Sequence, residues 1–115
     1  MARSLARSNA HFQRALRRMP LGVSSNFRYW GEETTPVITR AKGAYIWDAD
    51  GNRYIDYFGS WGPMILGHAF PAVVEAIQQA AAHSASFGAS TPAETDLAGL
   101  IKAAVLSIET MLACG

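Results

Sequence analysis

The sequence predicts an α+β fold with an N-terminal helix, a small antiparallel sheet built on a β-hairpin, and two further helices. Two observations carry this prediction. Aromatic and β-branched residues alternate over residues 44–48 and 53–57, on either side of an Asp-Gly turn, which is typical of a hairpin. Elsewhere apolar residues recur at helical spacing, before Pro20 and after Pro71 and Pro92. The length of 115 residues, half of them hydrophobic, suits one small domain.

Residues 1–20 are predicted to form an amphipathic helix that ends at Pro20. Leu5, Phe12 and Leu16 fall on one face, while arginines fill much of the rest. Six arginines precede the first acidic residue, Glu32, although the formal net charge is only +1. Such a start also fits an organellar transit peptide or a nucleic-acid contact. We expect the solvated face of a helix, and no nucleic-acid partner.

The middle of the chain is predicted to hold the sheet. Residues 21–36, rich in Gly, Ser and Thr, indicate an extended loop, and residues 37–40 suit a short strand. The hairpin follows, with its reversal at residues 49–52. These residues look briefly like a calcium loop, but the glycine comes too early and no glutamate closes the frame. We therefore expect a turn there.

A loop in which two glycines and a proline surround Trp61 follows the hairpin over residues 59–66. Its glycines suit a backbone that passes close to a ligand or another chain, and they suit an ordinary turn equally well. Pro71 stands where a first helical position would be, which predicts a helix over residues 71–83. His68, just before this helix, is predicted to cap it or to pack, with proton transfer as a further possibility.

The last helix is predicted over residues 92–106. Thr91 and Glu94 have the spacing of a capping box, and Pro92 suits the first helical position. Its predicted inner stripe is Leu97, Leu100, Ile101, Ala104 and Val105.

Composition excludes several classes of protein. No apolar run reaches the length of a membrane span, so we expect no membrane partner. Cys114 is the only cysteine, which excludes an internal disulfide and makes a reducing, cytoplasmic compartment the default. His11, His68 and His83 fall on separate predicted elements without ligand spacing, so no metal site is expected.

Three sequence words, PLGVSSNFR, GAYIWDADGNRYIDY and SWGPMILGH, together resemble the N-terminal region of class III aminotransferases. These pyridoxal-phosphate enzymes include glutamate-1-semialdehyde aminomutase and several ω- and β-amino-acid transaminases. The resemblance covers most of residues 21–108, and SWGPMILGH is closer to the aminomutase branch. It implies the N-terminal part of a fold-type I transferase, from a family in which homodimers are the rule.

The resemblance also implies cofactor chemistry that this chain does not match. The family forms a Schiff base between pyridoxal phosphate and a lysine far downstream, and neither Lys42 nor Lys102 matches it. The family's phosphate-binding Ser-Gly-Thr turn should follow Ser107-Ile108-Glu109, where this sequence diverges. We expect no catalytic and no cofactor-binding residue here, with residues 37–115 ending before the large cofactor domain through truncation, a frame shift or a recorded fragment.

Three residues are candidates for the substrate side of the pocket. Arg28 matches the family arginine that binds a substrate carboxylate, a role that suits the two parallel bonds of a guanidinium group. Ser25 is placed to add a hydroxyl donor, and Trp61 matches a tryptophan that lines the substrate cavity. Without the family, a solvated charge and a packed indole would be the simpler interpretations. Asn26 and Phe27 look more like the transaminase branch, so the substrate stays open between a γ-amino aldehyde acid and a β- or ω-amino acid.

Two functions from different classes follow. One is the N-terminal segment of a class III aminotransferase or aminomutase, inactive alone and acting on a carboxylate-bearing amino acid in the whole enzyme. The other is a non-catalytic interaction module that binds a partner through its apolar face. The first divides the chain into a helix (1–20), a substrate-side loop (21–36), and a hairpin with two helices (37–115).

Overall fold

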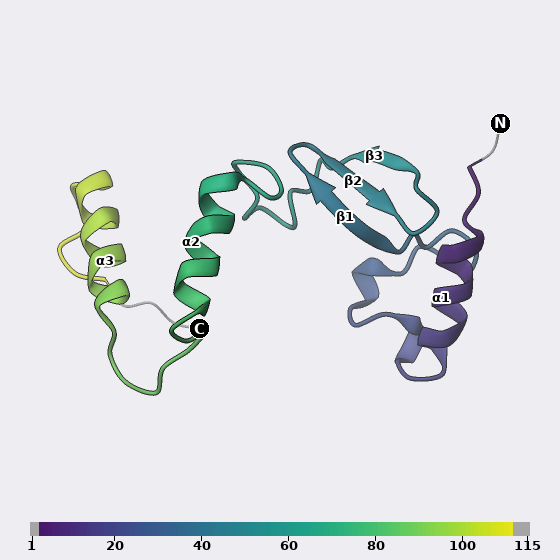
Figure 1. Cartoon of the computed structure of the whole chain (residues 1–115), viewed down its shortest axis with the longest axis horizontal. Helices are drawn as coiled ribbons and strands as arrows, with labels where there is room; N and C mark the ends of the chain where they lie inside the picture. The colour runs from purple at the N-terminus through teal and green to yellow at the C-terminus, as the bar shows by residue number, and fades with distance from the viewer. Residues whose placement is uncertain (1–2, 112–115) are drawn as a thin grey trace. The chain divides into compact units, whose positions relative to one another are not determined.

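The computed structural model describes residues 3–111, so Cys114 and most of the divergent tail lie outside the described residues. The chain divides into two compact units, Met1–Glu75 and Ala76–Gly115, which are described separately. Its elements follow the predicted order (Figure 1). They are α1 (Ala6–Leu16), the 3-10 turns η1 (Pro20–Gly22) and η2 (Asn26–Arg28), β1 (Ile38–Lys42), β2 (Tyr45–Asp48), β3 (Arg53–Ile55), α2 (Pro71–Ala81) and α3 (Pro92–Ala104).

The sheet has three antiparallel strands in the order β1-β2-β3, which confirms the α+β class and the hairpin. Tyr45 pairs with Ile55 and Trp47 pairs with Arg53, so the alternating residues of the two arms share faces. The register of β1 against β2 shifts between Ile38 and Arg40. The loop predicted as extended before the sheet contains η1 and η2.

Asp48 organises the hairpin turn from inside. Its side chain is 2% exposed, and its carboxylate accepts hydrogen bonds from the Asp50 and Asn52 N–H groups, the Asn52 amide and the Tyr54 hydroxyl. Burial raises the pKa of Asp48, but these hydrogen bonds together outweigh it and hold the pKa below its ordinary value. The turn therefore depends on an ionised, fully bonded carboxylate.

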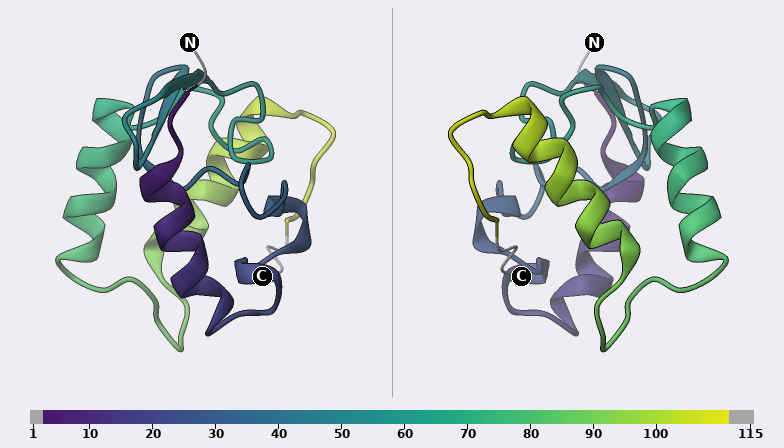
Figure 2. Two further views of the ribbon diagram at one scale, coloured as in Figure 1. Left: turned by 90° about the vertical axis from the view of Figure 1, so that its right-hand side faces the viewer. Right: turned by 90° about the vertical axis from the view of Figure 1, so that its left-hand side faces the viewer.

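The same turn holds the start of α1 (Figure 2). The Asp50 carboxylate accepts the Arg7 N–H at 2.8 Å and the Ser8 N–H at 2.9 Å, so it caps a helix that begins far away in the sequence. The Asn52 amide adds a bond to the Ser4 carbonyl at 2.7 Å. A carboxylate in this position satisfies free N–H groups and complements the helix dipole. Partial burial raises the pKa of Asp50, but the bonds from Arg7 and Ser8 outweigh it, so the net direction is downward.

The core of the first unit is small and partly polar. Phe12 and Ala15 of α1 are its buried apolar residues, whereas Leu5 and Leu16, predicted beside Phe12, are half-buried. Ser8 is fully buried, and its hydroxyl accepts a hydrogen bond from a backbone N–H of the segment before β1. Thr35 and Asp48 are also buried. Hydrogen bonds therefore organise this unit as much as apolar contact does.

The predicted helices near the C-terminus are present as α2 and α3. The Glu94 carboxylate accepts the Thr91 N–H at 3.1 Å, as the capping-box spacing predicts. Within residues 3–111, neither helix buries a side chain, and the predicted inner stripe of α3 includes Leu97 at 51% and Leu100 at 70% exposure. The stripe is apolar but is not covered by the residues that the structure describes. No helix among them is long and apolar enough to cross a membrane.

Candidate functional site

Arg28 closes the η2 turn on the surface of the first unit. Its side chain is exposed, and its Nη1 donates to the Ser24 hydroxyl at 3.0 Å. The predicted neighbour Ser25 is half-buried and precedes η2, where its carbonyl oxygen accepts the Arg28 N–H at 3.0 Å. Ser25 therefore shapes the turn that presents the arginine, while Ser24 provides the hydroxyl contact. Such an arginine has further N–H groups available for a carboxylate.

Trp61 lies next to the η2 turn. Its indole meets the Phe27 ring edge-on, with centroids 5.5 Å apart, and contacts the Phe58 ring with centroids 5.3 Å apart. Phe27 directly precedes Arg28, so the structure brings the loop of Trp61 beside the loop of Arg28. The indole is 65% exposed, which leaves most of one aromatic surface available.

An open depression of about 330 Å³ is lined in part by the loop that carries Trp61. Its lining is mostly apolar and backbone, with Asp56 and His68 as the ionisable members. The lining residues are Gly43, Ala44, Asp56, Gly59, Met64, Ile65, Leu66, Gly67 and His68.

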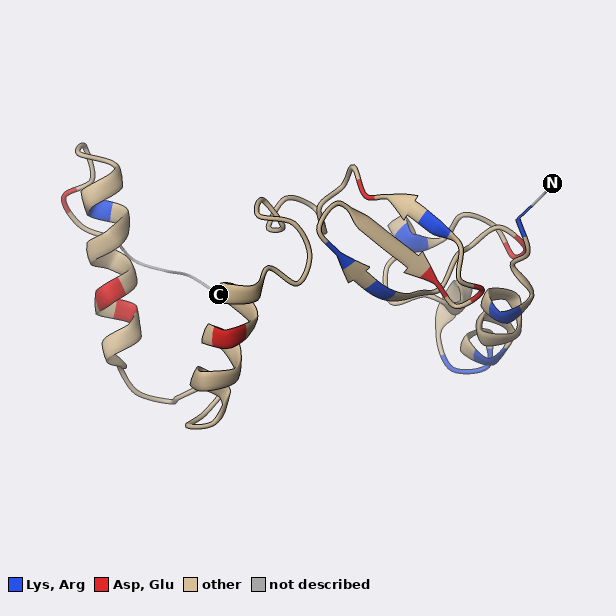
Figure 3. Ribbon diagram, turned by 45° about the horizontal axis from the view of Figure 1, so that its top comes forward, with Lys and Arg blue, Asp and Glu red and all other residues tan. Residues whose placement is uncertain are grey.

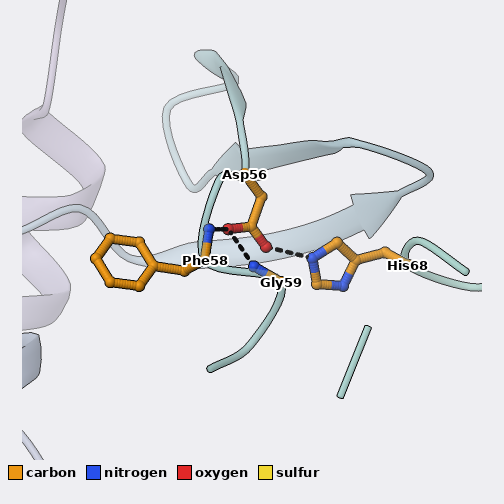
Figure 4. Close-up of polar contacts among 4 residues, drawn as sticks. All are labelled: Asp56, Phe58, Gly59 and His68. Atoms are coloured by element: carbon orange, nitrogen blue, oxygen red, sulfur yellow. Dashed lines mark hydrogen bonds and ion pairs between the residues drawn. The ribbon is translucent and has the colours of Figure 1, made fainter. Parts of the chain in front are cut away.

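Asp56 and His68 form a short hydrogen-bonded pair that the sequence did not reveal (Figure 4). The distance from His68 Nε2 to Asp56 Oδ2 is 2.6 Å, and the side chains are 14% and 10% exposed for His68 and Asp56. Hydrogen bonding from His68 holds the pKa of Asp56 below its ordinary value, helped by the Phe58 and Gly59 N–H groups and opposed by burial. In the sequence, only their positions at the two ends of the glycine-rich loop hint at this contact. The contact itself cannot be predicted without the tertiary structure of the loop.

Basic side chains stack on aromatic rings over the sheet. Arg40 lies 4.0 Å from the centroid of Trp47, and Arg53 lies 4.7 Å from that of Tyr45. Figure 3 shows Lys and Arg residues on β1, β3 and α1. A second open depression, of about 470 Å³, is lined by Arg3, Tyr45, Arg53, Tyr54, Ile55 and Tyr57.

Comparison with known proteins places these features in a family. The model of class-III aminotransferases matches residues 28–114. The chain is 57% identical over 110 residues to a glutamate-1-semialdehyde 2,1-aminomutase from Acidobacterium capsulatum, covering 93% of this chain and 25% of that protein. It is 59% identical over 105 residues to the enzyme of the same name from Rhodopirellula baltica, covering 90% and 24%.

Solved structures agree with the sequence relatives. A transaminase described with pyridoxal phosphate bound superimposes with a TM-score of 0.84 at 33% identity, covering 94% of this chain and 25% of that one. The chain therefore belongs to the class III aminotransferase family, and its fold is that of an N-terminal part of a fold-type I transferase. It spans about a quarter of the length of the curated relatives that it matches.

The lysines and two of the helix N-termini among the described residues do not fit a pyridoxal-phosphate site. Lys42 and Lys102 are both exposed, at the end of β1 and in the last turn of α3. A phosphate could also bind at a helix N-terminus. However, the Asp50 carboxylate already binds the N-terminus of α1. At the N-terminus of α3, Glu94 accepts the Thr91 N–H. We therefore assign no cofactor contact to the two lysines or to the N-termini of α1 and α3.

Proposed function

We propose that this chain provides the substrate side of a pyridoxal-phosphate enzyme of the class III family, and that the enzyme acts on a carboxylate-bearing amino acid. Aminomutase chemistry is favoured over transamination, because the two relatives at 57% and 59% identity are named as aminomutases. In this proposal the lysine and the phosphate site come from residues other than 3–111, so the chain is inactive alone.

The observation that carries the proposal is the approach of the Trp61 loop to the η2 turn. The edge contact between Phe27 and Trp61 puts an exposed guanidinium group and an exposed indole on neighbouring loops. Arg28 would bind the substrate carboxylate through two charge-assisted hydrogen bonds, with Ser24 fixing its orientation. Trp61 would line the cavity beside the substrate, and Ser25 would support the turn or donate a further bond.

The chain's division follows from these roles. We assign residues 1–20 to the N-terminal segment that contains α1, residues 21–36 to the substrate-side loop, and residues 37–115 to the segment with the hairpin and two helices. Homodimeric assembly is proposed on the family resemblance alone. A cytoplasmic location is proposed on the single cysteine in the chain.

A graft tests the carboxylate role in a complete enzyme. We would replace the matching segment of the Acidobacterium capsulatum relative with this chain and measure aminomutase kinetics. Arg28→Gln should raise KM roughly 30-fold, because charge-assisted bonds to the carboxylate are lost. Arg40→Gln is the matched control, since Arg40 is also an exposed arginine but lies over Trp47.

Equal effects of the two substitutions would contradict the role of Arg28. A graft that folds and binds the cofactor yet stays inactive would contradict the enzyme assignment.

A non-catalytic interaction module is the second candidate. Its supporting observation is the large number of exposed apolar side chains, among them Ile65, Leu66 and Leu106 at 90%, 61% and 95% exposure. The partner would be a class III subunit. Binding of the isolated chain to the intact Acidobacterium capsulatum relative, together with an inactive graft, would favour this candidate.

A further inference from the structure

Asp56 and His68 mark the two ends of one loop. Asp56 follows β3 and His68 precedes α2, so their 2.6 Å contact closes residues 57–67 into a ring. Both side chains are largely buried, although most large apolar residues between them are exposed. A short hydrogen bond to a partly desolvated carboxylate is stronger than the same bond in open water. The pair is therefore a structural feature of this loop rather than a chance surface contact.

The histidine end of the loop is fixed to the sheet. The Gly43 N–H donates to the His68 carbonyl at 2.8 Å, and the His68 N–H donates to the Gly43 carbonyl at 2.9 Å. Gly67 passes so close that a Cβ atom added there would lie 3.1 Å from the backbone of Gly43. These contacts fix the backbone position of His68, from which its imidazole reaches Asp56.

The aspartate end organises the interior of the loop. Asp56 Oδ1 accepts the Phe58 N–H at 2.9 Å and the Gly59 N–H at 3.1 Å. The carbonyls of these two residues then accept the N–H groups of Trp61 and Met64, both at 3.0 Å. Figure 4 shows the bonds of Asp56 to Phe58, Gly59 and His68. Together with the next bonds along the loop, they join the carboxylate to the backbone of Trp61.

The loop needs such support because its backbone is strained. Ser60 and Trp61 have φ angles of +56° and +68°, the left-handed region that costs non-glycine residues energy. Two consecutive residues in this region persist only where their surroundings hold them. The contacts of Trp61 with Phe27 and Phe58 depend on that conformation.

We propose that Asp56 and His68 form a clasp that sets the conformation of residues 57–67 and thereby positions the Trp61 indole beside the η2 turn. In this proposal neither residue contacts the substrate, and both act as positioning residues. The functional importance of this clasp rests on the proposed role of Trp61 at the substrate cavity. The clasp itself is a property of the chain without substrate.

NMR of the whole 115-residue chain tests the clasp. His68→Leu removes the donor to Asp56, so we expect the NOEs between the Trp61 indole and the Phe27 and Phe58 rings to disappear. Amide hydrogen exchange at Trp61 and Met64 should accelerate roughly tenfold or more. His68→Gln keeps an N–H donor and should restore most of the parental NOEs and protection.

Unchanged Trp61 contacts in His68→Leu would overturn the clasp. Equal loss in His68→Leu and His68→Gln would overturn it too, because the effect would then come from packing. The amides of β2 provide the control, and they should keep their protection in both variants.

A measurement on the unsubstituted chain guards against a variant that fails to fold. We expect a slowly exchanging His68 Nε2 proton in long-range ¹⁵N spectra, and rapid exchange of that proton would overturn the clasp. These readouts need no substrate. An Arg28→Gln graft without a KM effect would therefore refute the proposed carboxylate site and leave the clasp standing.

Discussion

The two units of the chain are stabilised in different ways. In the first, buried or half-buried carboxylates join distant segments, so Asp48 ties the hairpin, Asp50 caps α1, and Asp56 closes the loop of Trp61. In the second, α3 has its capping box, but no described side chain is buried. The first unit thus contains its own tertiary links, whereas the helices of the second present apolar surface. A fragment of a larger fold can therefore hold a defined local site while leaving other elements without a core.

The largest expected difference between the two units is their stability in acid, which should fall in the first unit. The folded-state pKa values of Asp48, Asp50 and Asp56 lie below their ordinary values, so each stabilises the fold above about pH 4. That stabilisation is lost as the pH falls through the folded-state values. Two-dimensional NMR between pH 7 and pH 2 should therefore show the amides of β2 and of the first turn of α1 losing their native shifts.

The variant Asp48→Asn tests the contribution of one of these carboxylates directly. The amide keeps an acceptor oxygen but cannot ionise, so the variant should be less stable at pH 7 and should depend less on pH below 4. Native shifts of β2 that persist at pH 2 would contradict the role given to these carboxylates.

Two glycines of the first unit distinguish packing from backbone strain. Gly22 has φ of +66°, and a Cβ there would lie 2.8 Å from Phe12 Cε2, whereas Gly51 has φ of +85° and open space around it. We expect Gly51→Ala to lower the free energy of unfolding by about 1 kcal/mol through strain alone. Gly22→Ala should lower it by about 2–3 kcal/mol, because the Phe12 ring must also move. Urea unfolding followed by tryptophan fluorescence measures both, and equal losses would mean that Phe12 is not packed on Gly22.

The smallest effect is expected in the second unit. Leu100 of α3 is 70% exposed, so Leu100→Gln should change the free energy of unfolding by less than about 0.5 kcal/mol. It should reduce self-association, since apolar surface drives that process. Sedimentation velocity and thermal circular dichroism measure the two effects, with Thr95→Gln as an exposed polar control on the same helix. A large loss of stability in Leu100→Gln would show that α3 is covered in solution, and the contrast between the units would fail.

Local patterns predicted the elements well because their causes are local. The Asp-Gly reversal, the proline at the start of α2 and the Thr91 capping box each act within a few residues. The missed features act across the chain. Asp50 looks like a turn residue in the sequence, and nothing near it indicates that its carboxylate caps α1.

The candidate site was predictable in part for the same reason. Arg28 and Trp61 were found by resemblance, and the structure puts their loops side by side, but their contact with substrate stays a prediction. The Asp56–His68 pair was missed because it spans a loop, and the left-handed backbone at Ser60 and Trp61 was missed because neither residue is glycine.

The cap on α1 also constrains the order in which the chain acquires structure. During synthesis, Arg7 and Ser8 leave the ribosome before Asp50, the residue 43 positions from Arg7 whose carboxylate binds their N–H groups. Short isolated helices are marginal in water, so α1 should stay largely unformed until the hairpin turn emerges. Within its unit, α1 would then be translated before the sheet and would be among the last elements to become stable.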